Sequence, residues 1–145
     1  MILVDSTAWI EYLRATGTPA DLRIQALLRA GEPIATTDFI LMKVLAGARG
    51  DEHRDRLRRL IAGCSHLPTD APGDYERAAD LYRNANAAGT KIRRLPECVT
   101  AVIAIRHDVA LLHADRGFDA IAEFAPLRIA SMPAAEHQMS SSDGT

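Results

Sequence analysis

The chain has 145 residues, of which 48% are hydrophobic and 25% are charged, and its formal net charge is −2 at pH 7. This length is typical of one domain, and such a chain buries most of its apolar surface without disulfides or a structural metal. The small net charge excludes a strongly polyanion-seeking protein, although a local basic patch is sufficient to bind nucleic acid.

Short apolar runs alternate with amphipathic segments along the chain. The runs indicate strands buried on both faces, and apolar residues at helical spacing indicate helices that pack on a sheet. In chain order, the pattern predicts a strand at residues 1–4, helices at 6–14 and 21–29, a strand at 33–36, helices at 38–47 and 54–62, a weak strand at 65–68, helices at 74–88 and 96–107, a strand at 109–113, a short helix at 118–124 and a last strand at 127–131.

Turn and capping signals bound these elements. Ser6 or Thr7 can cap the first helix, Gly31 can stop the second, and Pro96 suits a first helical turn. Strands that alternate with helices predict an α/β domain, in which helices cover both faces of a mainly parallel sheet of four or five strands. We expect one domain over residues 1–133, followed by a disordered tail at 134–145.

Two acidic residues directly follow predicted strands. Asp5 ends the run Ile2-Leu3-Val4, and Asp115 lies just beyond the strand at 109–113. Ligands of open α/β sheets sit outside the carboxyl ends of the strands. Carboxylates gathered there repel one another unless a cation lies between them, and Mg²⁺ and Mn²⁺ prefer such oxygen ligands. The two residues therefore predict a divalent-metal site, and the alternative is that each only caps the helix after it.

Four blocks of sequence carry a resemblance to a known family. They are ILVDSTAWI at residues 2–10, TDFILMKVLAG at 37–47, IRRLPECVTAVIAI at 92–105 and LLHADRGFDAI at 111–121. In this order the blocks resemble the four motifs of PIN-domain ribonucleases, specifically the VapC toxins of bacterial type II toxin–antitoxin pairs. Each block alone is degenerate, whereas the ordered set is specific.

The resemblance implies a fold, an activity and partners. It implies a three-layer α/β/α PIN sandwich, endoribonucleolytic cleavage of RNA that depends on Mg²⁺ or Mn²⁺, a cognate VapB-like antitoxin and a homodimer. Asp5 matches the first acidic metal ligand of the family, Glu97 matches a position usually held by aspartate, and Asp115 matches the aspartate of the fourth motif. These three residues are the expected metal-binding and catalytic set.

Three residues depart from the family pattern. Lys43 stands where glutamate is usual, Gly117 stands where a further aspartate is common, and Glu97 replaces aspartate. The lysine can act as a counterion in the cleft, extend its charge to solvent or contact an RNA phosphate. The extra methylene of Glu97 moves its carboxylate outward by about 1.5 Å. These departures define an alternative: a weakened or inactive PIN domain that binds antitoxin or RNA without cleaving.

Several side chains near the motifs are candidates for RNA contact. Ser6 follows the first acid, and its hydroxyl either orients metal or phosphate or caps the helix. Arg93 and Arg94, together with Lys91, form a basic cluster before the third motif. Such a cluster either grips RNA phosphates or is an ordinary solvated surface. With Lys43, these residues complete the predicted RNA-binding set.

The remaining features bound the cellular setting. Cys64 and Cys98 lack metal-ligand spacing, and we expect reduced, buried thiols. No charged segment or cleavage site precedes the first strand, and no apolar run approaches the roughly 20 residues of a membrane span. We therefore expect a cytoplasmic protein. A general nucleotide-binding module is disfavoured, because neither GxGxxG nor a Walker loop follows the first strand.

Overall fold

Four parallel strands lie at the centre of the computed structural model, which describes residues 1–132. Its elements, in chain order, are β1 (Ile2–Val4), α1 (Ser6–Leu13), α2 (Pro19–Ala30), β2 (Ile34–Thr36), α3 (Asp38–Ala46), α4 (Asp51–Ala62), β3 (Ser65–His66), α5 (Gly73–Ala87), α6 (Leu95–Arg106), β4 (Ala110–Leu112) and α7 (Gly117–Ala122). The predicted domain end at 133 and the predicted tail at 134–145 lie outside the described residues.

The strand order is β3-β2-β1-β4, and every pairing is parallel. Leu3 pairs with Leu111, and the same register sets Val4 opposite Leu112. Because the strands are parallel, their carboxyl ends meet at one edge of the sheet. The turns that leave β1 and β4 are therefore neighbours at that edge.

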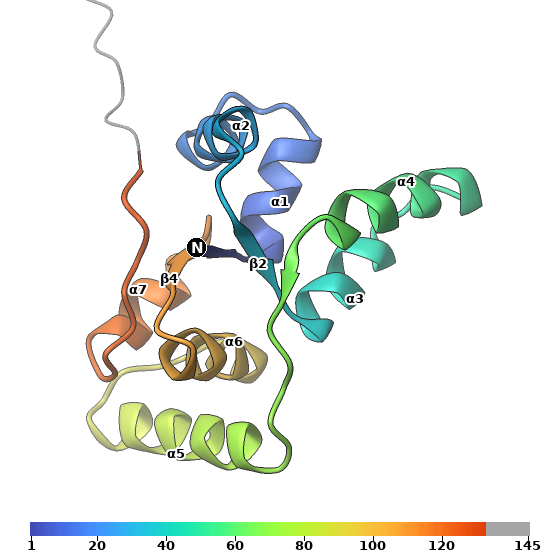
Figure 1. Cartoon of the computed structure of the whole chain (residues 1–145). Helices are drawn as coiled ribbons and strands as arrows, with labels where there is room; N and C mark the ends of the chain where they lie inside the picture. The colour runs from blue at the N-terminus through green and yellow to red at the C-terminus, as the bar shows by residue number, and fades with distance from the viewer. Residues whose placement is uncertain (133–145) are drawn as a thin grey trace, which may run out of the picture.

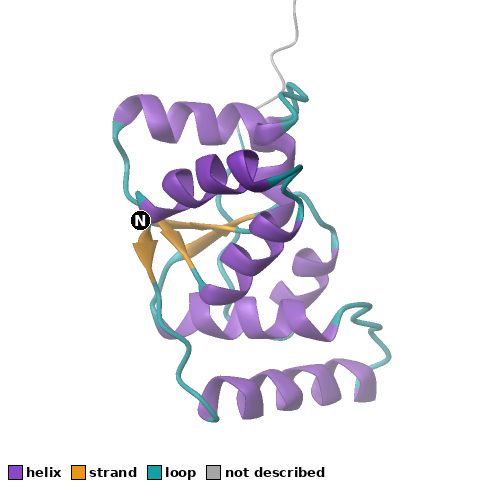
Figure 2. Ribbon diagram, turned by 90° about the vertical axis from the view of Figure 1, so that its right-hand side faces the viewer, coloured by secondary structure: helices purple, strands orange, loops and turns teal. Residues whose placement is uncertain are grey.

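Helices cover both faces of this sheet, as predicted for a three-layer α/β/α sandwich. Figure 1 shows α1 and α2 above the sheet, α6 below the sheet and α5 below α6. Figure 2 shows the strands enclosed between the helical layers. The largest completely buried side chains include Trp9 of α1, Ile24 of α2, Ile40 of α3, Ile103 of α6 and Phe118 of α7. Every layer thus contributes to one hydrophobic core.

Two helices begin two or more residues earlier than predicted, for identifiable reasons. Pro19 begins α2, since proline fits the first turn, where its missing N–H is not needed. Asp51 begins α4, because Asp51 and Glu52 complement the positive end of the helix dipole. Within residues 1–132, no helix has both the length and the apolarity required to cross a membrane.

The predicted last strand at 127–131 is wrong. Only one parallel bridge forms there, between Leu111 and Ile129. The N–H of Leu111 donates to the carbonyl of Arg128 at 2.9 Å, and the N–H of Ala130 donates to the carbonyl of Leu111 at 2.8 Å. The N–H of Leu127 is taken by a turn, where it donates to the carbonyl of Ala125 at 2.7 Å, so the pairing stays local.

The cysteine prediction is confirmed in part. Both thiols are free, with Cys98 buried and Cys64 half-buried. Burial raises the pKa of each thiol to about 11, so both remain protonated near neutral pH.

An ion pair ties α5 to α6 beside the core. The completely buried carboxylate of Asp74 accepts hydrogen bonds from Arg106 Nε at 2.9 Å and Arg106 Nη2 at 2.8 Å, and from the N–H of Asp70 at 2.8 Å. Burial alone raises the pKa of Asp74, but these hydrogen bonds and the charges of Arg106 and Arg77 lower it below its usual value. The net effect favours the ionised pair.

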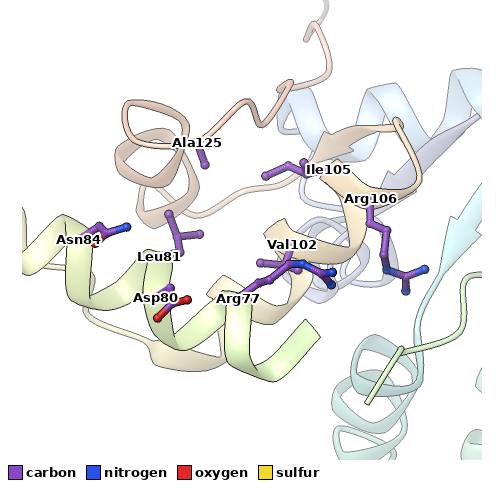
Figure 3. Close-up of a pocket in the computed structure, with 8 residues that line it drawn as sticks. All are labelled: Arg77, Asp80, Leu81, Asn84, Val102, Ile105, Arg106 and Ala125. Atoms are coloured by element: carbon purple, nitrogen blue, oxygen red, sulfur yellow. The ribbon is translucent and has the colours of Figure 1, made fainter. Parts of the chain in front are cut away.

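The same two helices leave an open hollow on their outer side. Its volume is about 480 Å³, and Figure 3 shows its walls. Leu81, Val102 and Ile105 line it with apolar surface, and the guanidinium groups of Arg77 and Arg106 lie at one end. The helix pair is thus held by a polar clamp beside an apolar contact.

Removal of the clamp is expected to destabilise the fold. Arg106→Met leaves the Asp74 carboxylate buried without its main partner, which costs about 3 kcal/mol of unfolding free energy. Arg128→Met is the matched control: Arg128 pairs with the exposed Asp108 and is expected to contribute less than about 1 kcal/mol. Urea unfolding at pH 7 measures both values, and equal losses would contradict the assignment.

The same variant predicts a pH dependence. The pKa of Asp74 is lower in the folded chain than in the unfolded chain. Its stabilisation is therefore complete above the unfolded pKa, about 3.9, and is lost as pH falls through the lower folded pKa. The stability difference between the native chain and Arg106→Met is thus expected to shrink as urea unfolding is repeated at increasingly acidic pH.

Candidate active site

The turns after β1 and β4 are joined by hydrogen bonds at the carboxyl edge of the sheet. The N–H of Asp5 donates to the carbonyl of Leu112 at 2.9 Å. The hydroxyl of Thr7 donates to Asp5 Oδ2 at 2.6 Å and accepts from the N–H of Ala114 at 3.1 Å. Thr7 therefore connects the first acid to the loop that carries Asp115. The sequence suggested only a capping role for Thr7, because this partner is 107 residues away.

Asp5 is the N-cap of α1, and the predicted capping by Ser6 or Thr7 is wrong. Asp5 Oδ2 accepts from the N–H of Thr7 at 3.0 Å, and Asp5 is only 3% exposed. Its second oxygen, Oδ1, accepts no hydrogen bond within the described residues. Asp5 thus caps the helix with one oxygen and has a second oxygen available at the sheet edge.

Two hydroxyls near this edge are buried without a partner among the described residues. They are Ser6 Oγ in the first turn of α1 and Thr36 Oγ1 at the end of β2. A buried hydroxyl without a hydrogen bond is costly, and such groups need a functional or structural explanation. Ser6 is completely buried, so its predicted contact with RNA stays a prediction that this position does not favour.

Glu97 and Asp115 bring their carboxyl groups together. Glu97 lies in the first turn of α6 and is 6% exposed, and Asp115 follows β4. Burial, followed by the hydrogen bond and charge of Asp115 and the charge of Asp5, raises the pKa of Glu97 to about 7, while Arg94 opposes this rise. The three predicted acids are thus electrostatically coupled.

Asp115 keeps its negative charge. Its Oδ1 accepts from the N–H of Gly117 at 2.9 Å, and this bond is the main reason that the pKa of Asp115 is lowered. The hydrogen bond from Glu97 and the charge of Arg94 act in the same direction, whereas burial acts against it. Near neutral pH the pair therefore holds one proton about half of the time, and this proton resides on Glu97.

Gly117 and Glu97 fit each other in shape. A Cβ atom at position 117 would overlap Glu97 Oε2 and would lie 3.4 Å from Asp115 Oδ1. The longer side chain of Glu97 therefore fills the volume that any larger residue at position 117 would need. Two of the three departures from the family pattern are complementary, which the sequence alone did not indicate.

The basic residues are distributed around the acids. Arg94 Nη1 lies 3.8 Å from Asp115 Oδ2, so the structure places Arg94 beside one of the predicted acids. Its neighbour Arg93 is exposed and lines a separate hollow between α5 and the loop before α6. Lys43 Nζ lies 5.5 Å from the ring centroid of Phe39, in a cation–π contact on α3.

This position of Lys43 excludes one of its three readings. Among the described residues, Lys43 forms no ion pair with Asp5, Glu97 or Asp115, and it is not one of the charges that shift the pKa of Glu97. The structure therefore does not contain the internal counterion that the sequence suggested. The half-buried side chain directs its charge along α3, as a lysine that reaches toward solvent does.

His113 supports the same loop as a structural residue. Its Nδ1 accepts the N–H of Asp115 at 3.1 Å, so the ring proton resides on Nε2, which lies 3.2 Å from Asp119 Oδ1. The ring is buried against Phe118. Both ring nitrogens of His113 thus have hydrogen-bond partners, and Asp119 is engaged with His113 rather than with the acids.

The donor chemistry of the site suits a hard divalent cation. Three carboxyl groups lie at this edge of the sheet, after β1, in the first turn of α6 and after β4, and the raised pKa of Glu97 gives it a proton that a cation can replace. In the part of the chain that the structure describes, no three His, Cys, Asp or Glu side chains already stand close enough to enclose an ion. Asp5 Oδ2 is hydrogen-bonded to Thr7, and the Glu97 carboxyl group contacts Asp115. The acids must therefore reorient to bind one metal ion together.

The fit of Glu97 over Gly117 yields a prediction that does not depend on any activity. Gly117→Ala is expected to destabilise the chain by no more than about 1 kcal/mol, because the methyl group overlaps only the far end of the flexible Glu97 side chain, which can shift. In a Glu97→Asp background the same change is expected to be neutral or stabilising, since alanine forms helices better than glycine. Urea unfolding of the four proteins measures this coupling. An equal cost in both backgrounds would contradict it.

Comparisons with known proteins agree with this geometry. The family model described as PIN domain matches residues 2–124. Ribonuclease VapC11 of Mycobacterium tuberculosis and a VapC ribonuclease of Mycobacterium bovis are each 40% identical over 132 residues, which is 90% of this chain and 98% of either relative.

Solved structures share the fold at low identity. VapBC2 from Rickettsia felis, bound to a DNA fragment from its promoter, is 12% identical with a TM-score of 0.68. VapBC-1 from nontypeable Haemophilus influenzae is 14% identical with a TM-score of 0.67. Each match covers 90% of this chain and 98% of the other chain. The chain therefore belongs to the PIN-domain family and, within it, to the VapC ribonucleases.

Proposed function

We propose that the chain is the toxin of a toxin–antitoxin system and a divalent-metal-dependent endoribonuclease that cleaves RNA phosphodiester bonds. One observation carries the proposal: Asp5, Glu97 and Asp115 are coupled at one sheet edge, and the pKa of Glu97 is raised to about 7. Perturbed acids in such a position are typical of functional sites. Relatives that are 40% identical are named ribonucleases, which supports the same activity.

In this proposal Asp5, Glu97 and Asp115 hold Mg²⁺ or Mn²⁺. A bound cation of this kind supplies an activated water and neutralises charge on the phosphodiester. Thr7 holds the Asp5 carboxylate in place, and the N–H of Gly117 keeps Asp115 ionised. Glu97 gives up its proton when it becomes a ligand, so metal binding and deprotonation are linked.

The proposed contacts with RNA come from the basic residues beside the acids. The guanidinium of Arg94 is within reach of a phosphate held next to Asp115, since it already lies 3.8 Å from that carboxylate. Arg93 and Lys91 extend the positive surface along the loop before α6. Lys43 offers a further phosphate contact from α3. Ser6 is completely buried, so its hydroxyl would act on the metal site and not on the RNA.

A second candidate function has its own support. The acids do not converge as a ready-made triad within the described residues, and Lys43 places a positive charge where the family usually has a carboxylate. These features favour a PIN domain that binds antitoxin or RNA without cleaving. The two candidates share the fold and the site and differ only in metal affinity and turnover.

The proposed protein partners are a VapB-like antitoxin and a second copy of this chain. Solved relatives of the same fold are VapBC pairs. On this chain, apolar side chains are exposed on neighbouring helices, with Ile10 and Leu13 on α1 and Met42 on α3. Exposed apolar surface of this kind is typical of protein interfaces.

Cleavage of single-stranded RNA in Mn²⁺ tests the proposal. Asp5→Asn is expected to lower the rate by more than the roughly 10–100-fold that loss of a merely supporting residue costs. Lys43→Glu is expected to raise Mn²⁺ affinity at least about tenfold, because it removes a positive charge and supplies the carboxylate that the family usually carries at this position. Isothermal titration with Mn²⁺ measures the affinity independently of turnover.

The controls separate the candidates. Asp80→Asn changes an exposed acid on α5 and is expected to leave both rate and affinity unchanged. Cleavage by Lys43→Glu alone would favour the non-cleaving candidate for the native chain. Equal cleavage by the native chain and Asp5→Asn would indicate a contaminating nuclease and overturn the site. Absence of Mn²⁺ binding by Lys43→Glu would argue against the carboxylate cluster.

Self-association gives a separate prediction. Light scattering of the purified chain is expected to give twice the 15.8 kDa chain mass. Because apolar surface drives such association, Met42→Lys is expected to shift the equilibrium toward monomer if α3 lies in the interface. A monomer at high concentration would overturn the dimer proposal and leave the nuclease proposal intact.

A further inference from the structure

A second hollow lies where the chain leaves α5 and turns toward α6. Its volume is about 460 Å³, which is within the usual range for pockets that bind small molecules. It is lined by Tyr82, Asn86, Gly89, Thr90, Lys91, Ile92 and Arg93. In Figure 1 the loop that forms one wall of this hollow is the segment that follows the C-terminal end of α5.

The lining combines three kinds of recognition chemistry. Tyr82 is half-buried and offers an aromatic face, Asn86 offers an amide that both donates and accepts, and Lys91 and Arg93 offer positive charge. Within the described residues, no hydrogen bond or ion pair involves any of these four side chains. Their polar groups are therefore available to a ligand.

The loop itself directs both cations outward. Ile92 is buried, whereas Lys91 and Arg93 on either side of it are exposed. Ile92 belongs to the hydrophobic core, so its anchoring leaves the two cations beside it at the surface, where both line the hollow. The positive edge of the hollow is thus a consequence of core packing.

The hollow adjoins the candidate active site along the chain. Arg93 is followed by Arg94, whose guanidinium lies 3.8 Å from Asp115, and Glu97 lies in the first turn of the helix that begins at Leu95. Arg93, which lines the hollow, is therefore next in the chain to the residue whose guanidinium approaches Asp115. A pocket in this position suits part of the substrate better than an unrelated small molecule.

We propose that this hollow binds one unpaired base of a single-stranded RNA beside the scissile phosphate. The ring of Tyr82 stacks on the base, the amide of Asn86 hydrogen-bonds its edge, and Lys91 and Arg93 contact the adjoining phosphates. Single-stranded RNA is recognised through this combination of stacking, edge contacts and backbone charge. The inference rests on the proposed function and adds to it the side chains that would select the RNA substrate.

Binding of a labelled single-stranded RNA in EDTA tests the proposal without cleavage. Tyr82→Leu is expected to weaken binding by roughly 5- to 150-fold, the range for loss of one stacked base, while Tyr82→Phe retains affinity. Asn86→Ala is expected to reduce the preference among homopolymers more than the overall affinity. Fluorescence anisotropy measures these changes, and circular dichroism confirms that each variant is folded.

The charges are tested by salt dependence against a matched pair. Lys91→Gln/Arg93→Gln is expected to lower the slope of log K against log salt by roughly 1.4 for a single strand. Arg58→Gln/Arg59→Gln removes the same charge from α4, which packs on α3, and is expected to leave the slope nearly unchanged. Equal slopes for the two double variants would overturn the proposed role of the loop.

The outcomes distinguish this inference from the nuclease proposal. Unchanged affinity of Tyr82→Leu, or equally tight binding of duplex RNA, would overturn the base pocket even if the chain cleaves RNA. Loss of affinity in Tyr82→Leu together with absence of cleavage in Mn²⁺ would support the pocket and overturn only the nuclease proposal. Retention of affinity in both Tyr82→Leu and Tyr82→Phe would show that the ring plays no part.

Discussion

The backbone contact between β1 and β4 is the constraint on which the site depends. Because these strands pair in parallel, with Val4 opposite Leu112, the acid that follows β1 lies next to the loop that carries Asp115. The hydroxyl of Thr7 extends this contact beyond the sheet and fixes the separation of the two turns. Like charges are therefore held together by hydrogen bonds that belong to the fold, and not by any attraction between them.

Such a cluster must lower its own repulsion when no cation is bound. The protein does so by placing a proton on Glu97, by keeping Asp115 ionised with the N–H of Gly117, and by approaching Asp115 with Arg94. The glycine has a double role, because it donates its N–H and leaves room for the longer acid. Glu97 and Gly117, which both depart from the family pattern, are therefore complementary in volume and charge. They are not two independent losses of the usual aspartates.

Much of this was predictable from the order of the residues. Buried runs located β1, β2 and β4, and the acids that follow β1 and β4 located the site at the carboxyl edge. Glu97 depended on the resemblance, since nothing in its local spacing indicates that the start of α6 faces Asp5. The β-bridge at Ile129 was overestimated as a strand because apolar runs do not show that a turn consumes the N–H of Leu127.

Side-chain directions were the part that sequence patterns did not provide. Thr7 spans two loops that only the folded chain brings together. The contacts of Lys43 with Phe39 and of His113 with Asp119 are local, but spacing alone does not show which neighbour each side chain turns to. The same limit applies to Gly117. Its meaning lies in a contact with a residue on another helix, which no local rule for glycine describes.

The clamp between Asp74 and Arg106 has a consequence for how such proteins diversify. The clamp joins the start of α5 to the end of α6, whereas the loop that carries Lys91 and Arg93 joins the opposite ends of the same helices. A helix of 15 residues is about 22 Å long, so the fastening lies far from the loop. Substitutions in the loop therefore leave the clamp intact. Related chains can keep the same fold and acids while the loop acquires residues that recognise different RNA.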